Sequence, residues 1–251
     1  MVKLTIDELE QLKKYRLNVN KAAPKLSIEC LDLLNEEKIK YFFNQMQVYI
    51  QTDHKAALGS MFIKRYAFIS VIALYSLSNL NKLLNVQLNN VTIYSYEDET
   101  NNNWLPFFHL KDITVKDIRQ NRNKYRDELL KTLFKNNIDR VIQTVAKCAK
   151  VSKWVLWENV AIYIFWLYET LLEDPSVVEQ KERINKDFLY IVQRADGKLF
   201  GQMNQNPLSR FYRPKAYNEK YQMEIRERMT CCLYYLTNKE GNRCKSCPCV
   251  C

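Results

Sequence analysis

Hydrophobic residues recur at helical spacing in the first third of the chain. Thr5 and Glu8 have the spacing of a capping box, which predicts that a first helix begins there. Asn35 can cap a second helix, because the apolar residues after it lie three or four positions apart. Those residues are Ile39, Phe42, Met46 and Ile50. A third helix is predicted from about His54 to Leu84.

The spacing of apolar residues shortens to two after the third helix. Two short runs alternate apolar and polar residues around an Asn89-Asn90 turn, which predicts two strands. The apolar members of these runs are Val86, Leu88, Val91 and Ile93. The stretch WLPFFHL can add another strand, which Pro106 would confine to a sheet edge. We therefore expect a small β insertion near 86–115.

Helical spacing returns from about 117 to 195. A helix near 122–135 is expected to continue into one that ends near Lys150, and Ser152 can start the next. One face of that next helix carries Trp154, Trp157, Ala161, Ile164, Tyr168 and Leu171. Asp174-Pro175 predicts a further helix start. Beyond the stop at ADGKLFG (195–201) we expect a loop over 202–215 and a short helix over 216–229.

These patterns predict a mainly α fold with a small β insertion, in the α+β class. Residues 1–229 would form a mainly helical body, and residues 230–251 a short cysteine-rich segment. The most apolar stretches, 65–80 and 154–172, contain polar residues, so we interpret them as core helices rather than transmembrane segments. The charged N-terminal residues do not resemble a signal peptide, and we expect a cytoplasmic protein.

Composition narrows the classes of function. The formal net charge of +10 suits an anionic partner, but Lys and Arg alternate with Asp and Glu and no nucleic-acid-binding motif is visible. We therefore expect no nucleic acid partner, while a small anionic ligand suits the charge equally well. The four glycines form no phosphate-binding loop, which argues against a nucleotide site of the common types. His54 is expected to be exposed and His109 to be structural.

Six of the eight cysteines lie in the last 22 residues, TCCLYYLTNKEGNRCKSCPCVC. In a reducing cytosol such a group binds metal more often than it forms disulfides. The candidate ligands are Cys231, Cys232, Cys244 and Cys247. The adjacent pair suits one tetrahedral zinc poorly, because consecutive side chains point apart, whereas an iron–sulfur cluster is a wider target. The spacing favours iron–sulfur and leaves zinc and a metal-free segment open.

The remaining cysteines are given lesser roles. Cys249 and Cys251 could substitute as ligands, pair with each other or have no role, and we favour no role. Cys30 and Cys148 lie in helical patterns and are expected to be buried in the core.

The cysteine segment resembles the C-terminal signature of the FhuF-type siderophore ferric reductases, a C-C-x10-C-x2-C motif that binds a [2Fe-2S] cluster. The stretches NPLSRFYRP and WENVAIYIFW also resemble that family, so the likeness covers roughly 150–248. Here eleven residues rather than ten separate Cys232 from Cys244. Lengthening a loop by one residue costs little, so we expect the motif to tolerate it.

The resemblance implies that Cys231, Cys232, Cys244 and Cys247 hold a [2Fe-2S] cluster. It further implies one-electron reduction of a ferric siderophore in the cytoplasm, which releases Fe²⁺ because hard oxygen donors bind it less tightly than Fe³⁺. No flavin or nicotinamide motif is present, so an external electron donor, such as a ferredoxin, a flavodoxin or a reductase, is expected. The first candidates for contact with an anionic siderophore are Arg210 and Arg213, followed by Lys215 and Arg226. Aromatic residues that could line the pocket are Trp104, Phe107 and Tyr212.

Two other classes of protein remain open. One is a zinc-stabilised binding protein whose basic surface holds nucleic acid or an acidic partner. The other is a siderophore synthetase, because the helical region also resembles the C-terminal part of those ligases. The missing phosphate-binding features and the cysteine segment argue against synthesis.

Overall fold

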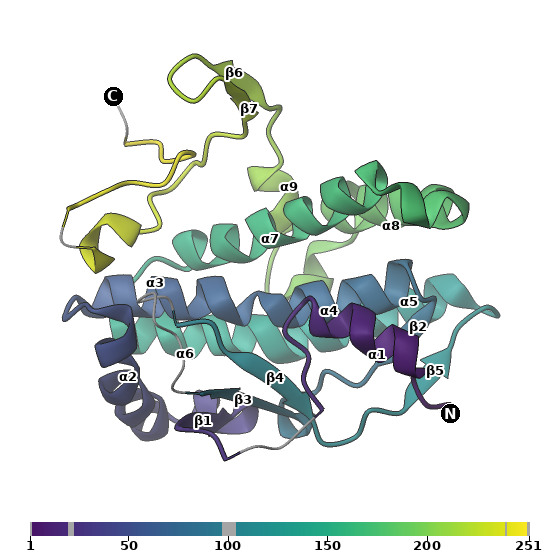
Figure 1. Ribbon diagram of the computed structural model, residues 1–251, viewed down its shortest axis with the longest axis horizontal. Helices are drawn as coiled ribbons and strands as arrows, with labels where there is room; N and C mark the ends of the chain where they lie inside the picture. Colours follow the sequence, from purple (N-terminus) through teal and green to yellow (C-terminus); the bar gives the residue numbers. More distant parts are fainter. Residues whose placement is uncertain (1, 20–22, 97–103, 239, 250–251) are drawn as a thin grey trace.

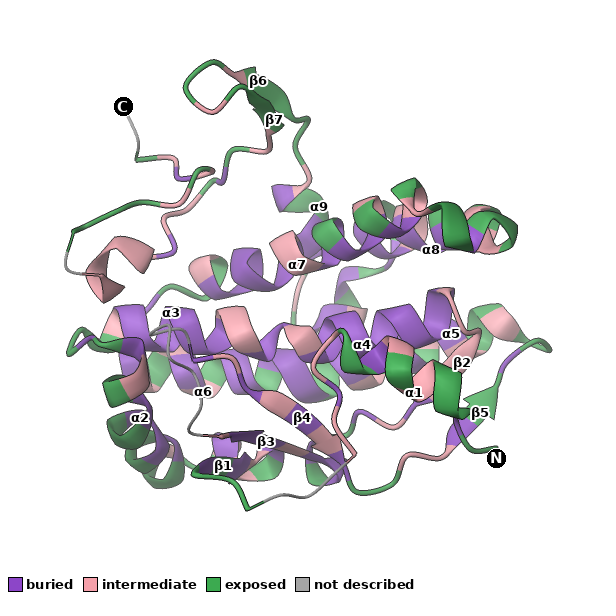
Figure 2. Cartoon of the chain, in the orientation of Figure 1, coloured by how far each residue is buried: buried purple, intermediate pink, exposed green. Residues whose placement is uncertain are grey.

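A row of long, buried helices forms the centre of the molecule (Figure 1). The computed structural model describes residues 2–19, 23–96, 104–238 and 240–249. Helices α3 and α4 run end to end, and α6 and α7 pack against them. Their bounds are Lys55–Tyr66 for α3, Phe68–Ser78 for α4, Asp139–Ala149 for α6 and Lys153–Glu173 for α7. Figure 2 shows that most of their side chains are buried.

Other helices surround this row: α1 (Ile6–Lys13), α2 (Glu36–Ile50), α5 (Arg122–Leu130), α8 (Lys181–Leu189) and α9 (Pro207–Phe211). The predicted caps are present, since Thr5 accepts a hydrogen bond from the Glu8 N–H and Asn35 caps α2. A π-helical segment, Lys131–Ile138, joins α5 to α6, so the helix predicted from about 122 to Lys150 is confirmed.

In the described part of the chain, the strands form three small antiparallel sheets. The first has the order β1-β3-β4, the second pairs β2 with β5, and the third is a separate hairpin of β6 and β7. Their bounds are Leu26–Glu29, Lys82–Leu84, Val91–Ser95, Phe107–Leu110, Val115–Asp117, Ala216–Asn218 and Met223–Ile225, in order from β1 to β7. The strand β4 follows Pro106 and lies at a sheet edge, as predicted.

Two predictions near the first sheet are wrong in detail. The third helix ends at Ser78 rather than Leu84, because Asn81 adopts a left-handed conformation that stops it. The run from Val86 to Leu88 is not a strand. The Asn90 side chain donates to the carbonyls of Asn85 and Asp112 there, so side-chain hydrogen bonds replace a strand partner.

The helix predicted over 216–229 is also wrong, because the chain forms the β6–β7 hairpin instead. The Asn218 side chain accepts a hydrogen bond from the Tyr221 N–H, and Gln222 is left-handed, so the segment turns back on itself. The expected loop over 202–215 contains helix α9, which Asn206 caps and Pro207 begins. The hairpin strands are largely exposed (Figure 2) and stand away from the helical body (Figure 1).

Both apolar stretches pack as core helices. Lys55–Ser78 and Lys153–Glu173 are long and apolar enough to cross a membrane by length and composition alone. In the described part of the chain they lie against other elements, and 89% and 61% of their most apolar windows are buried.

The mainly α fold with a small β insertion is confirmed. Among the single residues, His54 is exposed, His109 is half-buried and Cys30 is fully buried, as predicted. Cys148 is only half-buried.

Candidate metal centre

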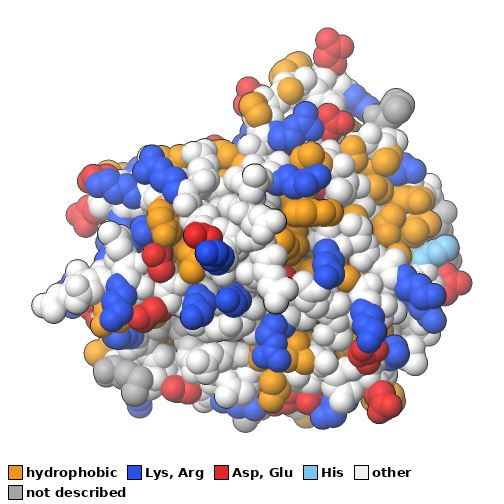
Figure 3. All heavy atoms as spheres, turned by 180° about the vertical axis from the view of Figure 1, so that it is seen from behind, with side chains coloured by type: hydrophobic (Ala, Val, Ile, Leu, Met, Phe, Trp, Pro, Cys, Tyr) orange, Lys and Arg blue, Asp and Glu red, His pale blue; other side chains and the backbone are white. Residues whose placement is uncertain are grey.

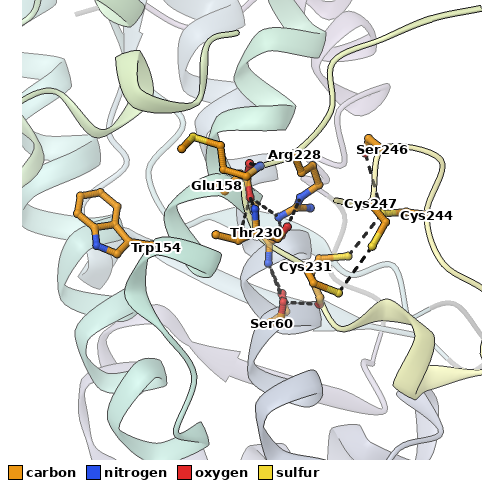
Figure 4. Close-up of polar contacts among 12 residues, drawn as sticks. Ser60, Trp154, Glu158, Arg228, Thr230, Cys231, Cys244, Ser246 and Cys247 are labelled. Carbon is orange, nitrogen blue, oxygen red and sulfur yellow. Dashed lines mark hydrogen bonds and ion pairs between the residues drawn. The ribbon is translucent and has the colours of Figure 1, made fainter. Parts of the chain in front are cut away.

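The four predicted cysteines come together as two pairs of thiols. The Sγ atoms of Cys231 and Cys247 lie 3.8 Å apart, and those of Cys232 and Cys244 lie 3.9 Å apart. Two thiolates bound at 2.3 Å to one tetrahedral metal lie about 3.8 Å apart, so each pair has the spacing of two ligands on one ion. The dashed lines in Figure 4 mark the two pairs.

The backbone divides the adjacent cysteines between the two pairs. Leu233 adopts a left-handed conformation directly after them, with a φ of 62°. Cys244 and Cys247 are joined by a tight turn, in which the Cys247 N–H donates to the Cys244 carbonyl at 3.0 Å. Adjacent side chains that point apart suit two metal ions better than one.

We call Cys231 with Cys247 the outer pair, and Cys232 with Cys244 the inner pair. Cys249 lies next to the outer pair. The Sγ atoms of Cys231, Cys247 and Cys249 all lie within 4.8 Å of one another, although we favoured no role for Cys249. Among the described residues, Cys232 and Cys244 do not belong to this group. Cys251 lies outside the described residues.

The surroundings of the inner pair favour ionisation of Cys232, and a thiolate is the form that binds a metal cation. The Cys244 thiol donates a hydrogen bond to Cys232 and, with the positive charges of Lys64 and Arg228, lowers the pKa of Cys232 to about 5. The same hydrogen bond raises the pKa of Cys244. Burial lowers the pKa of Lys64, whose ammonium lies 5.5 Å from the ring centre of Tyr234. Of these two thiols, Cys232 is therefore the one that ionises more readily.

Arg243 supports the outer pair. Its Nη1 atom lies 3.7 Å from the Cys231 sulfur and 3.8 Å from the Cys247 sulfur, and its guanidinium stacks on Tyr235 at 4.1 Å. Burial opposes ionisation of Cys247, but hydrogen bonds from the Cys249 N–H and Arg243 lower its pKa below the ordinary value. Positive charge and donated hydrogen bonds at sulfur stabilise the thiolate form that a metal requires.

A buried network that the sequence analysis missed anchors the chain before the cysteines. The Glu158 carboxylate accepts from the N–H groups of Met229 and Thr230 at 2.6 and 2.9 Å, and from the Thr230 hydroxyl. Arg228 Nη2 lies 3.4 Å from the same carboxylate, and both side chains are only 2% exposed. Figure 4 shows this network beside the thiols. Glu158 thereby fixes residues 228–230 on α7.

A second contact ties the inner pair to α3. Ser60 donates to the Cys232 carbonyl at 2.7 Å, and Asn159 donates to both the hydroxyl and the carbonyl of Ser60 at 2.9 Å. Asn159 also accepts from Arg228 at 2.8 Å. The polar residues Glu158 and Asn159 within an apolar helix were the signal in the sequence, because buried polar groups need partners.

The four predicted basic residues lie at two different places. Lys215 and Arg226 both pair with Glu169, at 2.8 and 2.7 Å, and line a cavity of about 310 Å³. We call it the hairpin cavity, because α7, Phe211, residues 223–228 of the hairpin arm, and Lys245 with Ser246 surround it. Arg210 instead stacks on Trp154 at 4.4 Å, and Arg213 is exposed.

The predicted aromatic residues do not gather at one pocket. Trp104 is buried at 2% exposure, and Phe107 belongs to β4. Tyr212 lies under the Arg226 guanidinium at 4.6 Å. Of the three, Tyr212 is therefore the one in contact with a residue of the hairpin cavity.

Surface charge does not form a continuous basic stripe on the face in Figure 3, where Lys and Arg are scattered among Asp and Glu. This distribution gives that face no basic groove of the kind that nucleic acid requires.

Comparison with known proteins identifies a protein family that the chain matches. Residues 60–218, more than half of the chain, match the family model described as "Ferric iron reductase FhuF-like transporter". The match runs from α3 to β6 and ends before the cysteine segment. Among curated proteins, the comparison finds no match.

Proposed function

Since the chain belongs to the FhuF-like ferric iron reductase family, we propose that it reduces ferric siderophores by means of a [2Fe-2S] cluster held by Cys231, Cys232, Cys244 and Cys247. The observation that carries the proposal is the division of these cysteines into two pairs at 3.8 and 3.9 Å. A two-iron cluster needs two thiolates on each iron, and two such pairs fit that need.

The chain's own residues would hold the cofactor and set its environment. When bound, a [2Fe-2S] cluster supplies the transfer of single electrons. Arg243 would donate to the outer sulfurs, while Lys64 and Arg228 would offset the negative charge of the inner thiolates. Ser60 and Glu158 would keep the segment on α3 and α7.

The substrate would be the ferric chelate, which takes one electron and becomes Fe²⁺. Siderophores bind iron through hard oxygen donors that hold Fe³⁺ more tightly than Fe²⁺, so reduction releases the metal without breaking the chelator. We propose that residues 1–229 bind the siderophore and that residues 230–251 hold the cluster. Each electron would come from an external donor, such as a ferredoxin, a flavodoxin or a reductase, in the cytoplasm.

A zinc site is the second candidate, and one observation favours it. Cys231, Cys247 and Cys249 offer three thiolates within 4.8 Å of one another, which is enough for one tetrahedral zinc with an outside fourth ligand. The two readings require different cysteines, since only the cluster needs Cys244 and only the zinc site needs Cys249.

The test is the visible spectrum of anaerobically purified protein, with iron, sulfide and zinc assayed on the same sample. We expect about two irons and two sulfides per chain, and absorbance that dithionite bleaches and a ferric siderophore restores. Cys244→Ser should lose the colour and Cys249→Ser should keep it. A colourless protein with one zinc that Cys249→Ser removes would refute the reductase.

A further inference from the structure

The hairpin cavity shares a wall with the cysteine pairs. Lys245 and Ser246, which line it, are the two residues between Cys244 and Cys247. Ser246 Oγ lies 4.0 Å from the Cys244 sulfur, and the Arg228 N–H fixes the turn by donating to the Ser246 carbonyl at 2.9 Å. A molecule in the cavity is therefore separated from the thiols by one tight turn of backbone.

Most of the charge in the cavity is already paired. Its cations are Lys215, Arg226, Arg228 and Lys245, and its carboxylates are Glu158, Glu169, Glu224 and Glu227. Glu169 holds Lys215 and Arg226, and Glu158 holds Arg228. These pairs fasten the hairpin arm to α7, so Arg226 and Lys215 build the wall of the cavity.

Lys245 is the cation left for a ligand. Its Nζ atom lies 3.9 Å from the Met223 sulfur and 5.6 Å from the Tyr221 ring centre, and no carboxylate of the described residues lies within 4.0 Å. An oxygen donor of a bound chelate would supply the missing partner, because such oxygens carry the negative charge that neutralises Fe³⁺.

Trp166 offers an aromatic surface to the same space. It projects from α7, is 44% exposed and lines the cavity. Phe68 and Tyr163 contact it, at 6.3 and 6.4 Å between ring centres, so the ring is held in place although it is exposed. An exposed but fixed aromatic ring is costly to leave in water and is a common contact surface for organic ligands.

We propose that the hairpin cavity is the binding site for the ferric chelate, with Trp166 packing on its organic frame and Lys245 pairing with a chelating oxygen at the cysteine end. This inference rests on the proposed function. The larger cavity around Trp154, of about 650 Å³, also contains cations, namely Lys135, Arg140 and Lys153. Trp154, however, lies beyond Glu158 from the cysteines (Figure 4), so this cavity is less suited to electron transfer and provides matched controls.

The experiment is isothermal titration of the loaded, oxidised protein with gallium(III) complexes of a trihydroxamate and of a tricatecholate. Gallium(III) resembles Fe³⁺ in charge and size but accepts no electron here, so the titration reports binding alone. Trp166→Ala and Lys245→Gln should each weaken the complex that binds wild type by at least tenfold. Trp154→Ala and Lys153→Gln should change that affinity less than twofold. Lys245→Gln alters an exposed side chain and keeps the test valid if Trp166→Ala does not fold.

Each outcome separates this inference from the proposed function. If the Trp154 and Lys153 variants bind the gallium complex more weakly, or if none of the four variants does, the hairpin cavity is not the chelate site. Either result would leave the proposed reductase activity intact. Cluster content is checked by the visible spectrum of every variant. If wild type binds neither gallium complex and its dithionite-reduced form is not reoxidised by either ferric complex, both proposals fail.

Discussion

The buried contact between Glu158 and residues 228–230 leads to the sharpest prediction. Glu158→Gln keeps the shape of the side chain but leaves the Arg228 guanidinium, 2% exposed, without a negative partner. Breaking a buried ion pair on one side costs about 3–5 kcal/mol. The N–H groups of Met229 and Thr230 bind different oxygens of Glu158, so the Gln amide keeps an acceptor for only one of them, and the loss of the other hydrogen bond adds to the destabilisation.

For a domain of this size each kcal/mol lowers the melting temperature by about 2–4 °C, so Glu158→Gln should lower it by roughly 6–20 °C. Scanning calorimetry under reducing, anaerobic conditions measures the shift. The matched control is Glu182→Gln, which removes a carboxylate that is 80% exposed and paired with Lys186, and which should leave the melting temperature unchanged.

A double variant tests the cause. Glu158→Gln combined with Arg228→Met removes both charges, and it should be less destabilised than the sum of the two single variants. A Glu158→Gln protein that melts with the Glu182→Gln control would refute the assignment of this pair as a buried anchor. The assignment would also be refuted if the destabilisations of the two single variants add up to that of the double variant.

Three further outcomes are expected. Burial raises the pKa of Asp139, so the folded protein holds that proton more tightly than the unfolded chain, and its stability falls as the pH rises above 3.8. Asp139→Asn should therefore melt higher than wild type at pH 7, and its advantage should vanish below pH 3.8; an equal gain at both pH values would contradict this. Gly201→Ala should lower the free energy of unfolding, measured by thermal denaturation, by about 2 kcal/mol or more. The reason is that φ of Gly201 is +111° and the new Cβ would lie 2.4 Å from an Asp139 oxygen. Arg243→Gln should lower the midpoint potential of the bound cluster in an anaerobic redox titration, because a positive charge and donors to the sulfurs of Cys231 and Cys247 are lost; an unchanged potential would argue against these contacts.

Local signals in the sequence predicted the parts of the fold that depend on neighbouring residues. Thr5 with Glu8, Asn35, and Ser152 mark helix starts through hydrogen bonds within three residues, and all of them are confirmed. The same reasoning applied to Asn206-Pro207 would have found α9. The spacing of the cysteines likewise predicted the candidate ligands, although only the fold shows that Cys231 pairs with Cys247 and Cys232 with Cys244.

The features that depend on distant residues could not be predicted this way. Glu158 and Arg228 are 70 residues apart in sequence, and Ser60 and Cys232 are 172 apart, so nothing local indicates that they meet. The hairpin was missed because Tyr217, Tyr221 and Ile225 have helical spacing, yet Tyr217 is 65% exposed. Helical spacing of apolar residues predicts a helix only when a core is available to bury one face. The β6–β7 hairpin stands away from the core.

The attachment of the cysteine segment to α3 and α7 has a consequence for how metal binding is coupled to folding. In zinc fingers the unfolded apo chain must order itself around the ion, so much of the binding free energy is spent on folding. Here Ser60 holds the Cys232 carbonyl and Glu158 holds residues 228–230, through hydrogen bonds that do not involve the thiol sulfurs. The four thiols would therefore act as a preorganised chelate on a body with its own core, and binding of the proposed cluster would not have to drive the folding of the rest of the chain.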